Sequence, residues 1–289
     1  MGRLVQCGLH PAEASIAGFQ ALMWQEPVAR RMRADVLLAV SVSLLMVFVA
    51  ATPAVGAAVA LLPRAQSLAG TAATATSLED SENWAGYVAT GADGTVTLAL
   101  GSWVEVAVNC ASSKTTYLAT WVGIDGFNTD DLVQTGTGAS CVDHVASYNA
   151  WWEVLPAPES PISTITVSPG DLMNASVTYS SGDFTMLISD VTTGVSFSKT
   201  EKVSSTARDA AECIVERPEV GVSLARLAKF TSDTFSYCSA EVSGVVGGIG
   251  SFASVYEIDM VTSSGKLIAA TGALSASESS FSVKWKGYG

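Results

Sequence analysis

Two short segments of the chain supply a side-chain amide and a carboxylate that together could activate a water molecule. The first runs from WVGIDG at residues 121–126 to VQTG at 133–136 and contains Gln134, while AECIVE at 211–216 ends in Glu216. A carboxylate can take a proton from a bound water, and an amide N–H can donate to the oxyanion that forms when this water attacks a peptide carbonyl. No other set of residues in the sequence offers so complete a set of chemical roles.

Other hydrolytic chemistries have little support in the sequence. After the first 62 residues the chain has a single histidine, His144, and its cysteines show no C-x-x-C spacing, so the ligands of a zinc site are lacking. Serine is abundant, but there is no Gly-x-Ser-x-Gly motif and no histidine placed to serve a serine triad. We interpret His144 as a loop residue and expect neither a metal nor an organic cofactor.

The elements that must position these residues are predicted to be strands. Apolar and polar residues alternate in several segments, which predicts half-buried antiparallel strands; the clearest segments are 96–100, 184–188, 256–260 and 281–285. Turn-forming residues separate such segments, at 91–94, 168–171, 180–183, 192–194 and 263–265. Many short strands with regular turns predict an all-β domain, one antiparallel β-sandwich. Only residues 224–228 show a helical pattern, worth a turn or two.

The N-terminal part of the chain is expected to lie outside this domain. An arginine cluster at residues 30–33 precedes an apolar stretch at 36–62 that ends in small residues, which is the pattern of a secretory signal. The stretch is also long enough for an uncleaved membrane anchor, and this alternative stays open. We therefore divide the chain into a leader (1–62), a linker or short propeptide rich in Ala, Thr and Ser (63–80), and the folded domain (81–289).

The charge of the domain limits its partners. The whole chain has a formal charge of −12, and residues 79–289 carry 10 Lys and Arg against 24 Asp and Glu, a charge of −14. Such a surface repels nucleic acid and anionic membranes, so we expect contact with a membrane only through a retained N-terminal segment. The charge suits a secreted protein that works in acid, although an acidic surface that merely aids solubility explains it equally well.

Motifs along the domain resemble those of the glutamic peptidases of family G1, the eqolisins, in family order. They are NWAG at 83–86, WVGIDG at 121–126, VQTG at 133–136, YNAWWE at 148–153, LPAP at 155–158, VSPGD at 167–171 and AECIVE at 211–216. Each motif is weak alone, but the ordered set is specific and covers almost the whole domain. The resemblance implies a jelly-roll-like sandwich, similar to concanavalin A-like lectins and glucanases, with the substrate cleft on its concave face.

By this resemblance the catalytic glutamine falls on Gln134 and the catalytic glutamate on Glu216. Glu216 would act as general base and then as general acid, while Gln134 would orient the water and stabilise the oxyanion. Four further residues stand where the family lines or braces its cleft: Trp84, Trp121, Asp125 and Glu153. The alternatives are a core position for the tryptophans and, for Asp125, a turn residue that caps its own backbone.

Glu212 lies four residues before Glu216, so on a strand the two carboxylates face the same side, where like charges can raise a pKa. A surface or hydrogen-bonding carboxylate is the alternative. The chain also departs from the family pattern around the cleft: Asn149 replaces a frequent Asp, and Thr137 and Gly138 stand where an acidic residue often follows the glutamine motif. These changes leave the dyad intact but alter the cleft.

Cysteines predict two disulfides, because four of the five lie in the expected secreted domain and four is an even number. Cys213 stands where many relatives carry Trp, and the segment at 235–238 resembles the strand that follows it in the family fold. The resemblance thus implies a bond between neighbouring strands from Cys213 to Cys238, with Cys110–Cys141 as the second.

We therefore expect a secreted, monomeric acid endopeptidase that acts on proteins or peptides. One alternative is a carbohydrate-binding module that uses the tryptophans as sugar platforms. Another is a glycoside hydrolase that uses paired carboxylates such as Glu153 and Glu216. Both alternatives leave the glutamine motif unexplained.

Overall fold

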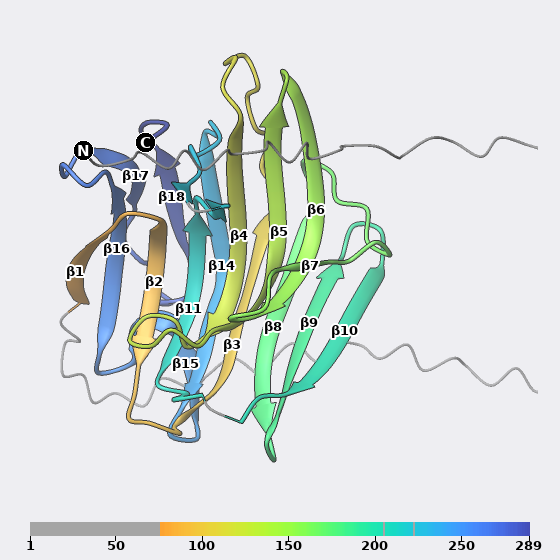
Figure 1. Ribbon diagram of the computed structural model, residues 1–289. Helices are drawn as coiled ribbons and strands as arrows, with labels where there is room; N and C mark the ends of the chain where they lie inside the picture. The colour runs from red at the N-terminus through yellow and green to blue at the C-terminus, as the bar shows by residue number, and fades with distance from the viewer. Residues whose placement is uncertain (1–75, 205, 222) are drawn as a thin grey trace, which may run out of the picture. The chain divides into compact units, whose positions relative to one another are not determined.

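A computed structural model describes residues 76–204, 206–221 and 223–289, and strands make up nearly all of its regular structure (Figure 1). The predicted leader and residues 63–75 of the predicted linker lie outside the described residues. The strands are β1 (Thr76–Ser81), β2 (Trp84–Thr90), β3 (Val96–Val104), β4 (Thr116–Ile124), β5 (Val133–Val142), β6 (Val145–Val154), β7 (Ser160–Pro161), β8 (Leu172–Ser180), β9 (Asp183–Asp190), β10 (Val195–Lys202), β11 (Ala210–Glu216), β12 (Glu219–Val220), β13 (Ser223–Leu224), β14 (Ser232–Val242), β15 (Val245–Gly248), β16 (Val255–Val261), β17 (Leu267–Thr271) and β18 (Phe281–Trp285).

Apart from β12 and β13, which form a separate two-stranded sheet, the strands form a sandwich from one hydrogen-bonded sheet that closes over itself. The sheet runs in the order β10-β9-β8-β3-β14-β18-β17-β16-β2-β11-β4-β5-β6-β7. Strands from its two halves face each other, since β3 contacts β4 and β11, and β8 and β9 contact β5. Apart from the parallel pair β1–β16, the paired strands are antiparallel. The predicted all-β antiparallel sandwich is confirmed.

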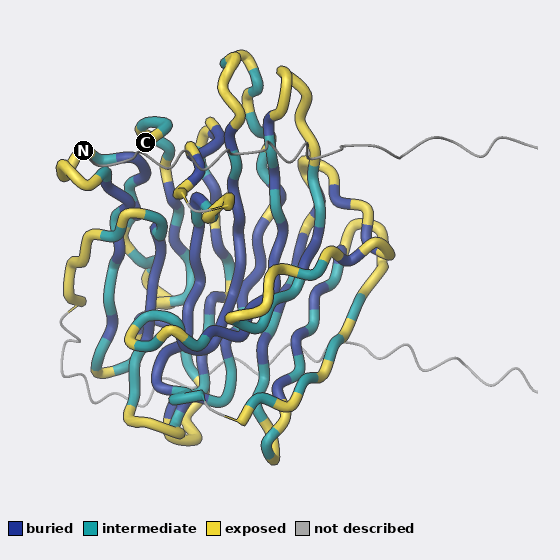
Figure 2. The backbone as a smooth tube through the Cα atoms, in the orientation of Figure 1, coloured by how far each residue is buried: buried dark blue, intermediate teal, exposed yellow. Residues whose placement is uncertain are grey.

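The core lies between the two layers, where the middles of the strands are buried and their tips exposed (Figure 2). On β9 the predicted alternation holds, because Phe184, Met186 and Ile188 are at most 1% exposed. Such side chains contribute about 1.5–3 kcal/mol each when buried. Strand β9 therefore contributes a full apolar face to the sandwich.

On β3 the alternation is offset. Leu98, predicted to face the core, is half-buried, whereas Ala99 and Trp103 are 1% exposed. The pairing of β3 with β14 changes register between Leu98 and Val96, and a bulge of this kind moves the following side chains to the opposite face. The sequence pattern alone cannot reveal such a shift.

The predicted helical turn at residues 224–228 is wrong. Leu224 ends β13, and Leu227 forms an isolated bridge with Tyr117 of β4. The Tyr117 N–H donates to the Arg226 carbonyl, so this segment satisfies its backbone against β4 instead of against itself. The helical structure of the described residues is one 3₁₀ turn, η1 (Ile249–Ser251), and no helix there is long and apolar enough to cross a bilayer.

Residues 76–80, which we assigned to the linker, form most of β1. This strand pairs with β16 in parallel, from Thr76 opposite Val255 to Ser81 opposite Met260. Its side chains are largely exposed, so β1 is attached mainly through its backbone. It ends two residues before β2 and therefore leads directly into the NWAG motif.

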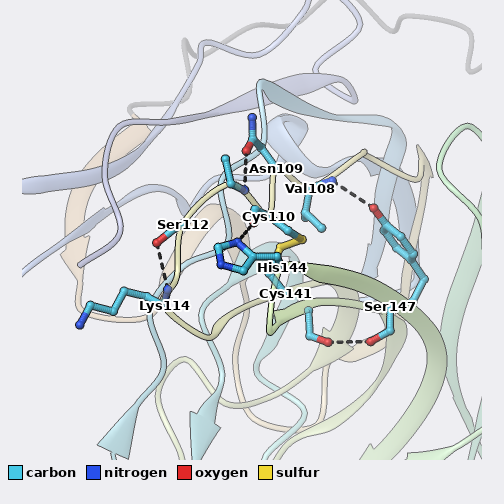
Figure 3. The surroundings of a disulfide bond; sticks show 11 residues. Val108, Asn109, Cys110, Ser112, Lys114, Cys141, His144 and Ser147 are labelled. Carbon is cyan, nitrogen blue, oxygen red and sulfur yellow. Dashed lines mark hydrogen bonds between the residues drawn. A yellow bond between two sulfur atoms is a disulfide. The ribbon is translucent and has the colours of Figure 1, made fainter.

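Both predicted disulfides are present. Cys110, in the loop after β3, is bonded to Cys141 of β5, with Cα atoms 5.3 Å apart. His144 lies beside this bond in the β5–β6 turn, and its Nδ1 donates to the Cys110 carbonyl at 3.0 Å (Figure 3). Cys213 of β11 is bonded to Cys238 of β14, with Cα atoms 6.4 Å apart. These two strands are not neighbours in the sheet but face each other across the core, so the second bond joins the two layers.

Candidate active site

Three adjacent strands, β11, β4 and β5, place the candidate catalytic residues on one face of the sandwich. Glu212 is paired with Gly123, and Gly123 in turn with Gln134. Residues that pair directly in antiparallel strands point to the same face, and so do residues four apart along one strand. Glu216 follows Glu212 by four residues, so Gln134 and Glu216 share this face.

A cavity of about 860 Å³ opens on this face, and both Gln134 and Glu216 line it. Trp84 and Glu153, which we expected in the cleft, line it as well. Its walls also include the LPAP segment at 155–158 and strands β12 and β13. The cavity thus lies over the faces of β4, β5 and β6 and is walled by loops around the two candidate catalytic residues.

Glu216 is held through both carboxylate oxygens. The Trp121 indole N–H donates to Oε2 at 2.7 Å, and the Asn83 amide donates to Oε1 at 3.2 Å. Removal from solvent raises the pKa of Glu216 to about 7, although hydrogen bonds from Trp121, Asn83 and Trp84 oppose the rise. A carboxyl group with this pKa can both accept and return a proton between acid and neutral pH.

Gln134 is 4% exposed, and its amide has one end fixed and one end unpaired. Its Nε2 donates to Oε2 of Glu153 at 2.6 Å. Its Oε1 is buried and has no partner among the residues that the structure describes. Burial raises the pKa of Glu153, the hydrogen bond from Gln134 lowers it, and the charge of Glu159 raises it again. Glu153 therefore sets the orientation of the amide, which presents a free acceptor next to the cavity.

Trp121 supports the site from the buried side of Glu216. It is fully buried, it packs edge-on against Trp84 with ring centroids 5.0 Å apart, and its N–H is directed to Glu216. Trp84 is only partly buried and forms part of the cavity wall. Trp121 therefore braces the carboxylate of Glu216, and Trp84 is available to a ligand.

Asp125 and Glu212 are not among the residues that line the cavity. Asp125 adopts a left-handed backbone conformation (φ 70°), and its carboxylate accepts the N–H groups of Arg208 and Asp209, both at 2.9 Å. It thus caps the segment that leads into β11 and not its own turn.

Glu212 is completely buried, and neither of its carboxylate oxygens has a partner within the described part of the chain. Burial raises its pKa well above the usual range, and the charges of Asp125 and Asp209 add to the rise. Like charges thus raise the pKa of Glu212, as expected, but the charges are those of Asp125 and Asp209 and not that of Glu216. In the described residues, no group of three or more His, Cys, Asp or Glu is arranged to hold a metal ion.

Two of the positions at which we expected a departure from the family pattern meet in the cavity wall. Gly138 of β5 pairs with Asn149 of β6, and both line the cavity. A Cβ atom at residue 138 would lie 2.6 Å from Oδ1 of Asn149, so the asparagine fills the space above the glycine. This part of the wall is polar but carries no charge.

Sequence reasoning missed two residues that interact with the predicted site residues. Asn83 belongs to the NWAG motif, but we assigned it no role, and it reaches Glu216. Asp209 belongs to no motif and lies beside Asp125 and Glu212. The position of Asn83 next to Trp84 was the one available signal; nothing in the sequence distinguishes Asp209.

The chain is similar to known proteins in both sequence and fold. Residues 82–285 match the Peptidase A4 family. Aspergillopepsin-2 of Aspergillus niger is 34% identical over 209 residues, which are 64% of this chain and 72% of the relative. The crystal structure of aspergilloglutamic peptidase from A. niger is 31% identical with a TM-score of 0.53, over 59% of this chain and 99% of that one. A structure of scytalido-glutamic peptidase with a transition-state analogue, at 23% identity, has the same fold, with a TM-score of 0.62 over 71% and 99% of the chains.

Proposed function

Since the chain belongs to the Peptidase A4 family and is a glutamic endopeptidase, we propose that it is secreted, that it works in acid solution, and that Gln134 and Glu216 form its catalytic pair. The observation that carries the proposal is their common cavity. There, Glu216 is held by two N–H donors and Gln134 presents a buried, unpaired carbonyl oxygen. The peptidase domain includes β1 and therefore starts at or before residue 76, earlier than the expected start at 81, and it follows a leader (1–62) and the remainder of the expected linker or propeptide (63–75).

The reaction begins with a water between the two side chains. The ionised Glu216 takes a proton from this water, whose other hydrogen is donated to Oε1 of Gln134, and the oxygen attacks the peptide carbonyl. The remaining N–H of Gln134 donates to the oxyanion of the tetrahedral intermediate. Glu216 then returns its proton to the amine nitrogen as the C–N bond breaks. General acid–base catalysis accounts for about 10²–10⁴-fold in rate, and one oxyanion donor for about 10²–10³-fold.

Two properties of the carboxyl groups bound the pH range. Glu216 must be ionised to act as a base, so activity rises with pH toward its pKa of about 7. Glu105 lies between the layers, and burial raises its pKa to about 8. The fold is therefore most stable when such groups are protonated. Both conditions are met together in weakly acid solution, where part of Glu216 is ionised and Glu105 is still protonated.

Incubation of the purified protein with casein and with polysaccharides, from strongly acid to neutral pH, tests the proposal. We expect cleavage of casein that resists pepstatin-type, metal-chelating, serine and cysteine inhibitors, and no change in the polysaccharides. A folded protein that leaves casein intact throughout this range, or that hydrolyses a polysaccharide, would refute it. N-terminal sequencing of the protein recovered from the medium tests secretion, with a start after residue 62 expected.

A further inference from the structure

The residue before Trp84 contacts the proposed base directly. Asn83 lies between β1 and β2, and its Nδ2 donates to Oε1 of Glu216 at 3.2 Å. The backbone there is fixed as well, because the N–H of Arg217 donates to the carbonyl of Asn83 at 3.0 Å. One carboxylate oxygen of Glu216 thus depends on Asn83, just as the other depends on Trp121.

The end of β1 determines which way the amide of Asn83 points. The hydroxyl of Ser81 donates to Oδ1 of Asn83 at 3.1 Å. The same hydroxyl oxygen accepts the backbone N–H groups of Asn83 and Trp84, at 3.3 and 3.2 Å. An amide that accepts through Oδ1 on one side must present its N–H on the other. Ser81 thereby directs the donor of Asn83 toward Glu216.

The charge of Glu216 is sensitive to such a donor, because burial favours its neutral form and a hydrogen bond to the carboxylate favours the ionised form. The ionisable groups that line the cavity with Glu216 are Glu153 of β6, Glu159 just before β7, Glu219 of β12 and Tyr117 of β4. Arg217 follows Glu216 in the chain, and Glu82 precedes Asn83. The Nε of Arg217 donates to the carbonyl of Glu82, and no ion pair between Arg217 and Glu216 forms within the described residues. Neutral N–H donors are therefore the groups that hydrogen-bond the Glu216 carboxylate.

We propose, on the basis of the catalytic role proposed for Glu216, that Asn83 is a positioning residue that keeps this carboxylate ionised and aimed at the cavity, and that Ser81 orients the Asn83 amide for this task. The short strand β1 then completes the active site, although its own side chains are mostly exposed. An asparagine that only supports the backbone would affect stability and leave the ionisation of Glu216 unchanged.

Peptide-cleavage kinetics over a range of pH distinguish these roles. Asn83→Ala removes the donor, and the acid limb of kcat/KM should move up by about one pH unit, which is about tenfold in rate on that limb. The near-isosteric Asn83→Asp should move it further, because two carboxyl groups then face each other. Ser81→Ala should shift it in the same direction by less. Asn128→Ala is the matched control, since Asn128 donates to Asp209 at 2.9 Å, away from Glu216.

Carboxyl ¹³C titration by NMR gives a second readout that needs no activity, with the Glu216 signal assigned by its loss in Glu216→Gln. The pKa of Glu216 should be higher in Asn83→Ala than in the wild type, and the same in Asn128→Ala. An unchanged pKa, or an activity loss that is uniform with pH, would overturn the inference. A wild type that cleaves no peptide would instead refute the proposed function, and the titration would still decide the role of Asn83.

Discussion

Glu105 offers a test of how this fold depends on pH. It lies between the layers and is 4% exposed, close to the fully buried Asp233. The hydroxyl of Thr120 donates to Asp233 at 2.6 Å, and one oxygen of each carboxyl group has no partner among the described residues. Burial raises the pKa of Glu105 to about 8, a hydrogen bond from Thr137 opposes the rise, and the charge of Asp233 adds to it.

The direction of the pH effect follows from this raised pKa. Between the ordinary value of 4.5 and about 8, the folded protein keeps a proton on Glu105 that the unfolded chain has lost. The stabilisation is complete below pH 4.5 and disappears as the pH rises to about 8. At 1.36 kcal/mol per pKa unit, the loss is on the order of 5 kcal/mol, comparable with the total stability of many domains.

Glu105→Gln removes this proton equilibrium while nearly keeping the shape of the side chain. Urea unfolding followed by circular dichroism at pH 4 and pH 8 measures the free energy of unfolding of the variant and the wild type. Between the two pH values, the free energy of unfolding of the wild type should fall by several kcal/mol more than that of Glu105→Gln. The packing cost of the amide is the same at both pH values, so it cancels in this comparison. Glu79→Gln, at an exposed position of β1, is the control and should behave like the wild type. If Glu105→Gln loses as much stability as the wild type, the reasoning about this buried carboxyl is wrong.

Three further changes have defined outcomes. Glu153→Ala removes the acceptor for Gln134 Nε2, so kcat should fall roughly tenfold with little change in KM, and an unchanged kcat in steady-state peptide assays would contradict this role. Glu212→Gln should keep its activity near the optimum but lose less stability than the wild type from acid to neutral pH, because burial raises the pKa of Glu212; thermal unfolding at both pH values checks this. Replacing Cys213 and Cys238 together by Ala opens a 25-residue loop and should lower the free energy of unfolding by about 3.5 kcal/mol, which urea titration measures.

The parts of the fold that follow from local pattern could be predicted from the sequence. Period-two alternation located β9, and glycine- and aspartate-rich turns separated the strands, because each signal depends on only a few neighbouring residues. The pairing of the cysteines came from the resemblance to a family. The resemblance did not predict that β11 and β14 lie in facing layers, because no local sequence pattern indicates which half of the sheet a strand joins.

Features that depend on distant contacts were missed. The bulge in β3 results from pairing with β14, more than 130 residues later in the chain, and the segment at 224–228 gives up its helical pattern for bonds to β4. Likewise, Asn83 meets Glu216 across 133 positions. The role of Asn83 depends on where β1 ends, and the Ala-, Thr- and Ser-rich composition of residues 63–80 did not indicate a strand there.

The most direct test of the central claim is the rate of peptide cleavage by Glu216→Gln at the pH optimum of the wild type. The glutamine is nearly isosteric but cannot accept the proton of water, so the rate should fall at least ~10²-fold while the circular dichroism spectrum stays unchanged. Glu219→Gln, which alters an exposed carboxylate on the wall of the same cavity, should keep the wild-type rate. A folded Glu216→Gln protein that cleaves casein at nearly the wild-type rate would contradict the assignment of Glu216 as the catalytic base.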